Sequence, residues 1–164
     1  FRLPPPSSII PLMSFNATYA HTNIIARDWR KLADFYIHIF GCVFVPPERD
    51  ISGEKLEAGT GILEGHLRGA HLRLPGFGDG GPTLEIYTYN ILADEGVKAV
   101  NRPGFGHIAF GVDDVAAASE AVFAAGGKPI GQMVTTQIAT GAKVTWRYVT
   151  DPEGNIIELQ SWSR

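Results

Sequence analysis

Two stretches of the chain show the same order of apolar and polar positions. The first begins at His21, where HTNIIA reads as a short strand; beyond Asp28, large apolar side chains recur every three or four residues up to Phe40. The second begins at His107, where HIAFGV is followed by the alanine-rich VAAASEAVFAAGG. Apolar residues at such a spacing line one face of a helix. Each stretch therefore predicts a strand followed by a helix.

The two stretches are related by one offset of 86 residues, which is 107 minus 21. Three positions are identical at that offset: His21 and His107, Asp28 and Asp114, and Gly41 and Gly127. The aspartates suit helix N-caps, because a short carboxylate accepts hydrogen bonds from the free N–H groups of the first turn. The glycines suit helix ends, where a left-handed backbone is favourable. The pattern therefore predicts a duplicated unit.

Further strands complete each copy. The segments GPTLEIYTY (81–89) and GNIIELQSW (154–162) each carry a glutamate four residues after a glycine, within a strand-like pattern. In the second copy, KPIGQMV and KVTWRYV add two strands, and DPEGN is a turn signal before the last strand. Each copy is thus predicted to be a βαβββ module. The fold class is predicted to be α+β, with two tandem βαβββ modules.

Residues 15–164 are expected to form a single domain, with module one at about 17–90, a joint at 90–103 and module two at about 104–162. The first copy is 13 residues longer from histidine to glutamate (64 against 51), and this excess is expected as a loop between Val45 and Pro82. Residues 1–14 contain three consecutive prolines and no apolar run of signal-peptide length. We expect them to be a vector-derived or disordered tail, since Met13 could serve as a start.

Composition narrows the function classes. A net charge of −3 over 164 residues gives no electrostatic reason to expect nucleic acid as a partner. No apolar run approaches the ~20 residues of a membrane span, so no membrane association is expected. The single cysteine, Cys42, cannot form an internal disulfide, so nothing calls for an oxidising compartment. A cytoplasmic protein is expected.

Alternation along the strands places four candidate metal ligands at equivalent positions. The large apolar neighbours of each residue suit packing under the helix, so the residue itself points to the other face of the sheet. If the modules pair about a pseudo-twofold axis, the four could converge in one cleft, and two imidazoles with two carboxylates suit Zn²⁺, Ni²⁺, Co²⁺, Mn²⁺ or Fe²⁺. Taken singly, each histidine has an ordinary alternative as a hydrogen-bonded core or surface residue. The four are His21, Glu85, His107 and Glu158.

Other polar residues are candidates for the walls of this cleft. Tyr87 and Tyr89 share a face with Glu85, and Gln160 and Trp162 share a face with Glu158, so these four are predicted to contact the substrate. Glu64 could be a further acid or base, or an exposed strand-end carboxylate. His66 and His71 are expected to be loop or surface residues, although one of them could approach the substrate. Five cations could meet an anionic substrate tail, and the sequence does not choose among them: Arg68, Arg73, Arg102, Lys143 and Arg147.

The segments GFGHIAFGVDDV (104–115) and YVTDPEGNIIEL (148–159), with the tandem module pattern, resemble the vicinal oxygen chelate superfamily. That superfamily includes glyoxalase I, methylmalonyl-CoA epimerase, extradiol dioxygenases, and bleomycin and fosfomycin resistance proteins. The resemblance implies a glyoxalase-like domain whose cupped sheets enclose one divalent metal ion held by His21, Glu85, His107 and Glu158. This His/Glu/His/Glu set looks like that of glyoxalase I.

The resemblance implies a metal-dependent isomerase or lyase that abstracts a proton next to a carbonyl group of a small-molecule substrate. Glu158 is the preferred base and Glu85 the second choice. Two alternatives remain, a metal-dependent dioxygenase or transferase on the same fold, and a non-catalytic small-molecule-binding protein of the antibiotic-resistance type. We expect a homodimer, and the four ligands could come from one chain or be exchanged between two chains.

Overall fold

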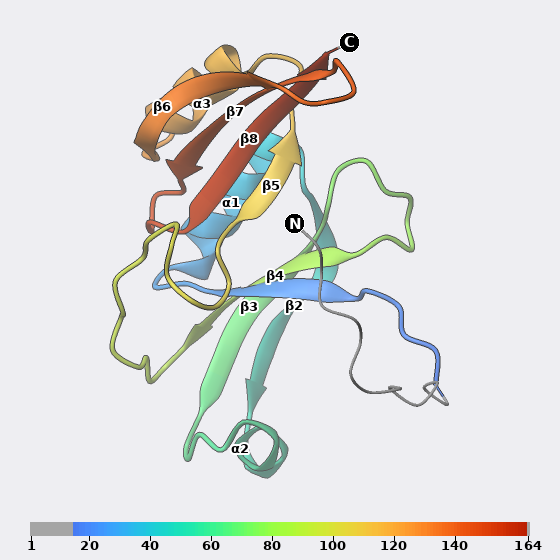
Figure 1. The fold of residues 1–164 in the computed structure, drawn as a ribbon. Helices are drawn as coiled ribbons and strands as arrows, with labels where there is room; N and C mark the ends of the chain where they lie inside the picture. Colours follow the sequence, from blue (N-terminus) through green and yellow to red (C-terminus); the bar gives the residue numbers. More distant parts are fainter. Residues whose placement is uncertain (1–14, 164) are drawn as a thin grey trace, which may run out of the picture.

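The chain folds into two four-stranded sheets that share one hydrophobic core (Figure 1). The structure is a computed structural model and describes residues 15–163. The elements of the first half are β1 (His21–Ile25), α1 (Trp29–Phe40), β2 (Val43–Ser52), α2 (Glu54–Thr60), β3 (His66–Arg73) and β4 (Thr83–Tyr89). Those of the second half are β5 (Ile108–Gly111), α3 (Val115–Ala124), β6 (Lys128–Gln137), β7 (Lys143–Thr150) and β8 (Ile156–Ser163). The α+β class and the repeated module are confirmed.

Helices α1 and α3 begin at the predicted aspartates. The Asp28 side chain accepts a hydrogen bond from the Lys31 backbone N–H, and the Asp114 side chain accepts from the N–H groups of Ala116 and Ala117. These bonds satisfy first-turn donors that no carbonyl of the helix can reach. At the other end, Gly41 takes the left-handed conformation with φ of +69° and stops α1. Local sequence therefore fixes both ends of α1 and the start of α3.

The two sheets have the same strand order. The first runs β1-β4-β3-β2 and the second β5-β8-β7-β6, and in each the first strand is parallel to its neighbour while the remaining pairs are antiparallel. Thus the strand that begins at or just after a candidate histidine lies beside the strand that carries a candidate glutamate. In register, Asn23 pairs with Glu85 and Ala109 pairs with Glu158. The duplication seen in the sequence is therefore a duplication of topology.

The longer first copy contains a helix where a loop was expected. Helix α2 lies between β2 and β3 and ends at Gly61, which has φ of +73°. It buries none of its residues, so it has no apolar stripe that a periodicity search could detect. Glu64 lies in the turn that follows, with a φ of +54°. This residue is exposed and lies outside the strand. The expectation of a plain loop in this segment was wrong.

The helices of the two modules meet in the shared core. Helix α1 packs on β3 and β4, α3 packs on β6, β7 and β8, and the two helices touch each other. Phe40 of α1 stacks on Phe110 of β5 with ring centroids 4.0 Å apart, and Tyr36 beside them is fully buried. Figure 1 shows α1 lying between the two sheets. Burial of these aromatic rings joins the modules into one unit.

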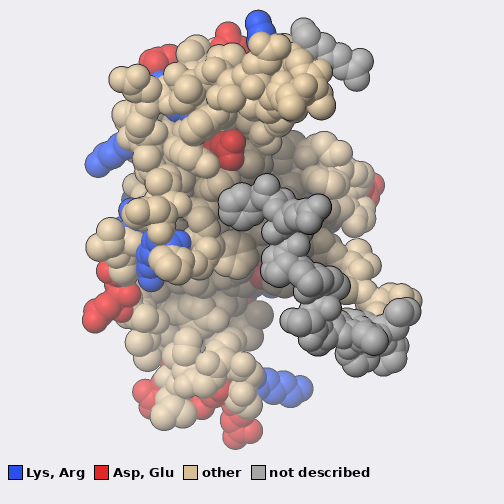
Figure 2. Space-filling model, in the orientation of Figure 1, with Lys and Arg blue, Asp and Glu red and all other residues tan. Residues whose placement is uncertain are grey.

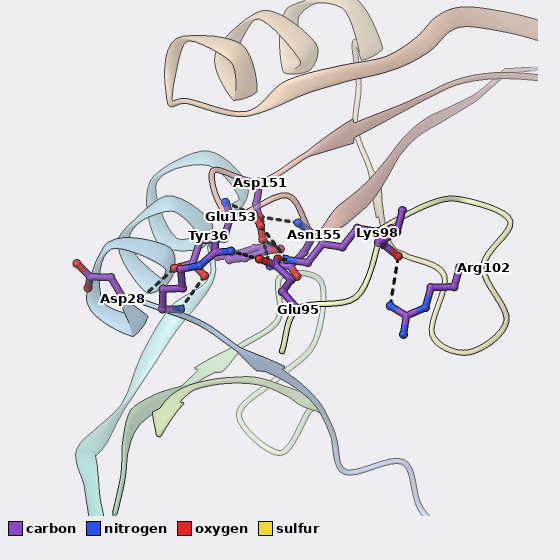
Figure 3. A network of polar contacts seen from close by, with 10 residues as sticks. Asp28, Tyr36, Glu95, Lys98, Arg102, Asp151, Glu153 and Asn155 are labelled. Atoms are coloured by element: carbon purple, nitrogen blue, oxygen red, sulfur yellow. Dashed lines mark hydrogen bonds and ion pairs between the residues drawn. The ribbon is translucent and has the colours of Figure 1, made fainter. Parts of the chain in front are cut away.

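A polar contact between the modules lies beside this aromatic cluster (Figure 3). The Tyr36 hydroxyl donates to Asp151 at 3.0 Å, and both residues are buried. Asp151 also accepts from the Glu153 and Asn155 backbones and the Asn155 amide, so its carboxylate is well supplied with donors. Burial raises the pKa of Asp151 above its usual value, and these hydrogen bonds offset only part of that rise. Glu153 in turn accepts from the backbone N–H groups of Arg27 and Asp28.

The shared core decides where the candidate ligands point. Leu84 and Ile86 of β4, and Ile157 and Leu159 of β8, are fully buried on the core side of their sheets. Because side chains alternate along a strand, Glu85 and Glu158 lie on the opposite faces. Each ligand-bearing face is therefore directed away from the core that the two modules share.

Candidate metal and substrate site

The first module gathers three polar side chains around Glu85. This carboxylate is only 9% exposed, and one of its oxygens, Oε1, lies 3.1 Å from His71 Nε2 and 3.4 Å from His21 Nδ1. His71 also lies 2.5 Å from the Tyr87 hydroxyl. Strands β1, β3 and β4 supply these side chains, and the register places His71 directly opposite Glu85. The predicted pair His21 and Glu85 is thus in contact, and His71 joins it.

The second module forms a matching but simpler pair. His107 Nε2 lies 2.9 Å from Glu158 Oε2, with the two side chains 32% and 20% exposed. Tyr148 of β7 lies directly opposite Glu158, and its ring centroid is 5.1 Å from that of His107. Trp146 packs edge-on against Tyr148 and pairs with Gln160 in register. An aromatic wall therefore borders the second pair.

His71 and Tyr148 occupy equivalent positions, and neither was predicted to contact a candidate ligand. His71 was expected to be a loop or surface residue, with the alternative that it or His66 approaches the substrate; it lies within β3 with 22% of its side chain exposed. A signal for both is present in the hairpins. His71 and Glu85 stand seven residues on either side of Gly78, and Tyr148 and Glu158 stand five residues on either side of Glu153. In an antiparallel hairpin, residues equidistant from the turn face each other.

Partial burial shapes the protonation of the groups around these pairs. Desolvation lowers the pKa of His71 below its usual value, although the nearby Glu85 carboxylate raises it. Desolvation and the same carboxylate raise the pKa of Tyr87 to about 12. Burial and Glu158 raise the pKa of Tyr148 in the same direction. Near pH 7 the two tyrosines are therefore protonated donors and His71 is mainly neutral.

The four candidate ligands form two pairs, each on its own sheet. Within residues 15–163, no group of three or more histidine, cysteine, aspartate or glutamate side chains is arranged to hold a metal ion. In the first module the imidazoles of His21 and His71 point their nitrogens at the carboxylate oxygen itself. Each pair offers one imidazole and one carboxylate, a donor set that suits a divalent ion once two pairs are combined. The donors fit a metal, but one chain presents them as two halves.

The remaining predicted residues fall into two groups. Tyr89, Gln160 and Trp162 lie further along the ligand-bearing strands. Tyr89 is partly buried at the end of β4, and the Trp162 indole N–H donates to the Gln160 side chain at 3.0 Å. His66, by contrast, lies at the start of β3 and contacts Asp50 on β2, at a distance of 2.5 Å. It belongs to the opposite face of β3 from His71, as the odd spacing of five residues requires. His66 is therefore not part of the Glu85 cluster.

Comparison with known proteins bears on the fold and the family. The model of the Glyoxalase/Bleomycin resistance protein/Dioxygenase superfamily matches residues 18–159. A glyoxalase family protein from Bacillus cereus has a similar structure, with a TM-score of 0.76 and 20% identity over 93% of this chain and 100% of that one. A glyoxalase I mutant from Zea mays gives a TM-score of 0.59 and 20% identity over 87% of this chain and 45% of that one. No curated protein matches the chain.

At these identities the solved structures show a common fold and no more. A glyoxylase/bleomycin resistance protein/dioxygenase domain from Frankia sp. EAN1pec is a further example, with a TM-score of 0.55 and 15% identity over 92% of this chain and 95% of that one.

Within residues 15–163, no helix has the length and apolar character that crossing a membrane requires. The arrangement of the two pairs remains the main guide to chemistry.

Proposed function

The chain belongs to the Glyoxalase/Bleomycin resistance protein/Dioxygenase superfamily, and from that membership we propose that it is a divalent-metal-dependent isomerase or lyase. The reaction we propose is removal of a proton from the carbon next to a carbonyl group of a small molecule. One observation carries the proposal: His21 with Glu85, and His107 with Glu158, are in contact at equivalent positions of two equivalent modules.

The full ligand set is completed by a second copy of the chain. Each chain directs its two ligand-bearing faces away from its own core, so module one of one copy pairs with module two of the other. Large apolar side chains exposed on these faces support the pairing, since Ile25 is 46% and Trp162 is 57% exposed. In the view of Figure 2 the described surface of the upper half is mostly uncharged apart from an acidic group near its middle, and further charged side chains lie towards the margins and over α2. These observations support a homodimer with two shared sites.

The chain's own residues divide the work in the proposed reaction. His21, Glu85, His107 and Glu158 would hold the divalent ion, which would supply Lewis-acid polarisation of a carbonyl oxygen. Glu158 accepts the proton, because it contacts one histidine and keeps 20% of its side chain exposed. Glu85 is held by two imidazoles and is more deeply buried, so it stays in place. Tyr148 and Trp146 exclude water from one side of Glu158.

Metal content per chain tests the ligand set. Protein purified without chelators is offered Zn²⁺, Ni²⁺, Co²⁺, Mn²⁺ or Fe²⁺, and the bound metal is measured by elemental analysis. About one tightly held ion per chain is expected, with loss or weakening in the His107→Ala and Glu158→Gln variants. His38→Ala is the matched control, because His38 is exposed on α1 and its imidazole is in hydrogen-bond contact with the Asp34 carbonyl, away from the candidate ligands. If the wild-type protein holds no specific ion under any condition, the metalloenzyme proposal is wrong.

Proton exchange and mass in solution test the remaining parts. With metal bound, α-hydroxy ketone adducts and acyl thioesters are incubated in D₂O, and exchange at the carbon next to the carbonyl is followed by NMR. At metal concentrations that saturate the variant, Glu158→Gln should lose exchange with at least one of these substrates. Glu85→Gln should bind metal more weakly than Glu158→Gln. Sedimentation should give a dimer. A monomer that binds one ion at full affinity would contradict the shared site.

A further inference from the structure

A pocket of about 270 Å³ lies where the two modules meet, between the edge strands β1 and β5. The joint between the modules closes its third side. Four isoleucines from three strands give it an apolar floor: Ile24 and Ile25 of β1, Ile108 of β5 and Ile156 of β8. Its volume is close to the lower end of the range for small-molecule sites. A ligand there would bury apolar surface against both modules at once.

The charge of this pocket has one sign. The joint contributes Lys98 and Arg102, His107 forms part of the wall, and no carboxylate is among the described residues that line it. In a chain with a net charge of −3, such a lining is a local departure from the average. Positive charge beside low-dielectric walls attracts anions.

The two cations differ in how much of their charge is already used. Lys98 Nζ pairs with Glu95 at 2.9 Å and donates to the Glu153 carbonyl at 2.7 Å (Figure 3). The Arg102 guanidinium makes no ion pair with any residue that the structure describes. It donates to the Val97 carbonyl at 3.3 Å, and the Arg102 backbone N–H donates to the Ala99 carbonyl. Arg102 is therefore the cation available to a ligand.

The joint also holds the Arg102 side chain in place. A side-chain carbon at Gly96 would lie 3.0 Å from both terminal nitrogens of Arg102, so the guanidinium rests against the bare backbone of Gly96. A guanidinium held in this way presents a planar fork of donors to a carboxylate or phosphonate. Arg102 also lines the pocket, where a ligand can reach it.

We propose that this pocket binds the anionic end of a small organic molecule with an apolar body, with Arg102 as its counter-ion. The apolar body lies over the floor of isoleucines. Because His107 lines the pocket and contacts Glu158, the far end of the molecule is directed towards the second candidate pair. Only this last step rests on the proposed function; the binding of the anion does not. The substrate is then an anionic carbonyl compound, and the joint selects it.

Benzoate and its neutral match benzamide test the proposal directly. Both are titrated into metal-free, ¹⁵N-labelled protein, and binding is followed through the backbone amides of residues 104–108 and 154–156. Benzoate is expected to bind saturably at these amides, at least tenfold more tightly than benzamide. Raising the salt concentration should weaken the binding of benzoate and leave the binding of benzamide unchanged. Phenylphosphonate is titrated in parallel, and tighter binding than benzoate would identify the charged group as a phosphonate or phosphate.

Variants separate this site from the metal site. Arg102→Met should lower the affinity for benzoate at least tenfold. Arg73→Met, which removes the same charge outside the pocket, should leave that affinity unchanged. Glu158 does not line the pocket, so Glu158→Gln should lose or weaken metal binding and keep benzoate binding. Equal affinity for benzoate and benzamide, unchanged binding in Arg102→Met, or no saturable binding of either anion would overturn the proposal. Failure of the metal experiment would leave it standing.

Discussion

Replacing Tyr36 by phenylalanine removes one hydrogen bond between the modules and leaves their packing intact. The hydroxyl lies 3.0 Å from Asp151 Oδ2, and the two residues are 0% and 1% exposed, so water cannot replace the lost bond. Hydrogen bonds to charged groups contribute about 1.5–3 kcal/mol, and the remaining donors keep the Asp151 carboxylate supplied. We expect Tyr36→Phe to lower the free energy of unfolding by about 2 kcal/mol.

The same substitution should behave differently when Asp151 is already absent. In Asp151→Ala the buried Tyr36 hydroxyl loses its acceptor, and an unsatisfied buried donor costs about 1–3 kcal/mol. Removing that hydroxyl then costs nothing or restores stability. A double-mutant cycle should therefore give a coupling free energy of about 2 kcal/mol or more between the two residues.

Urea unfolding at pH 7, on metal-free protein at one fixed concentration, measures all four proteins of the cycle. Tyr19→Phe is the matched control: Tyr19 is 63% exposed, so water can replace the exposed hydrogen bond between its hydroxyl and Thr22, and the change should stay within about 0.5 kcal/mol. If Tyr36→Phe costs the same in both backgrounds, the hydrogen bond between the modules contributes nothing. The modules would then be joined by apolar packing alone.

Three further changes test local features of the fold. Gly69→Ala should destabilise the protein by more than about 3 kcal/mol in urea unfolding, because the new side-chain carbon would lie 2.1 Å from the Ile86 carbonyl oxygen; normal stability would show that β4 yields easily. Asp114→Ala should cost about 1 kcal/mol through the lost helix cap, while the neighbouring Asp113→Ala should not, and equal losses would contradict the cap. Burial raises the pKa of the Cys42 thiol to about 11 from 9.0, so the folded state holds its proton more tightly than the unfolded chain. The stability that this group contributes is therefore full below pH 9 and is lost as pH rises through 11. In Cys42→Ala the free energy of unfolding should fall by about 2–3 kcal/mol less than in the wild type between these pH values. An unchanged dependence of the unfolding free energy on pH would count against a buried thiol.

The parts of the fold that the sequence predicts are those with local causes. An aspartate cap, an apolar stripe and a terminal glycine lie within fifteen residues of one another in α1, so its bounds could be read directly. Helix α2 has no buried side chain and its N-cap Gly53 makes no side-chain capping bond, so nothing in its sequence distinguishes it from a loop. The alternation along β4 and β8 likewise predicts which face carries each glutamate.

What the sequence could not supply are the contacts between distant segments. The stacking of Phe40 on Phe110 decides that both helices share one core, and no local pattern contains it. For that reason the sequence left open whether the four candidate ligands meet within one chain. The contact between His71 and Glu85 depends on the register of the β3–β4 hairpin. That register is set by the position of the turn, not by the local pattern of either strand.

The outward direction of the two ligand-bearing faces has a genetic consequence. In the proposed dimer, each site takes module one from one chain and module two from the other. A chain carrying His21→Ala and a chain carrying Glu158→Gln would each be inactive alone. Mixed dimers would contain one site with both defects and one site with neither. Coexpression of the two mutant genes should therefore restore activity, whereas two mutations within the same module should never complement each other.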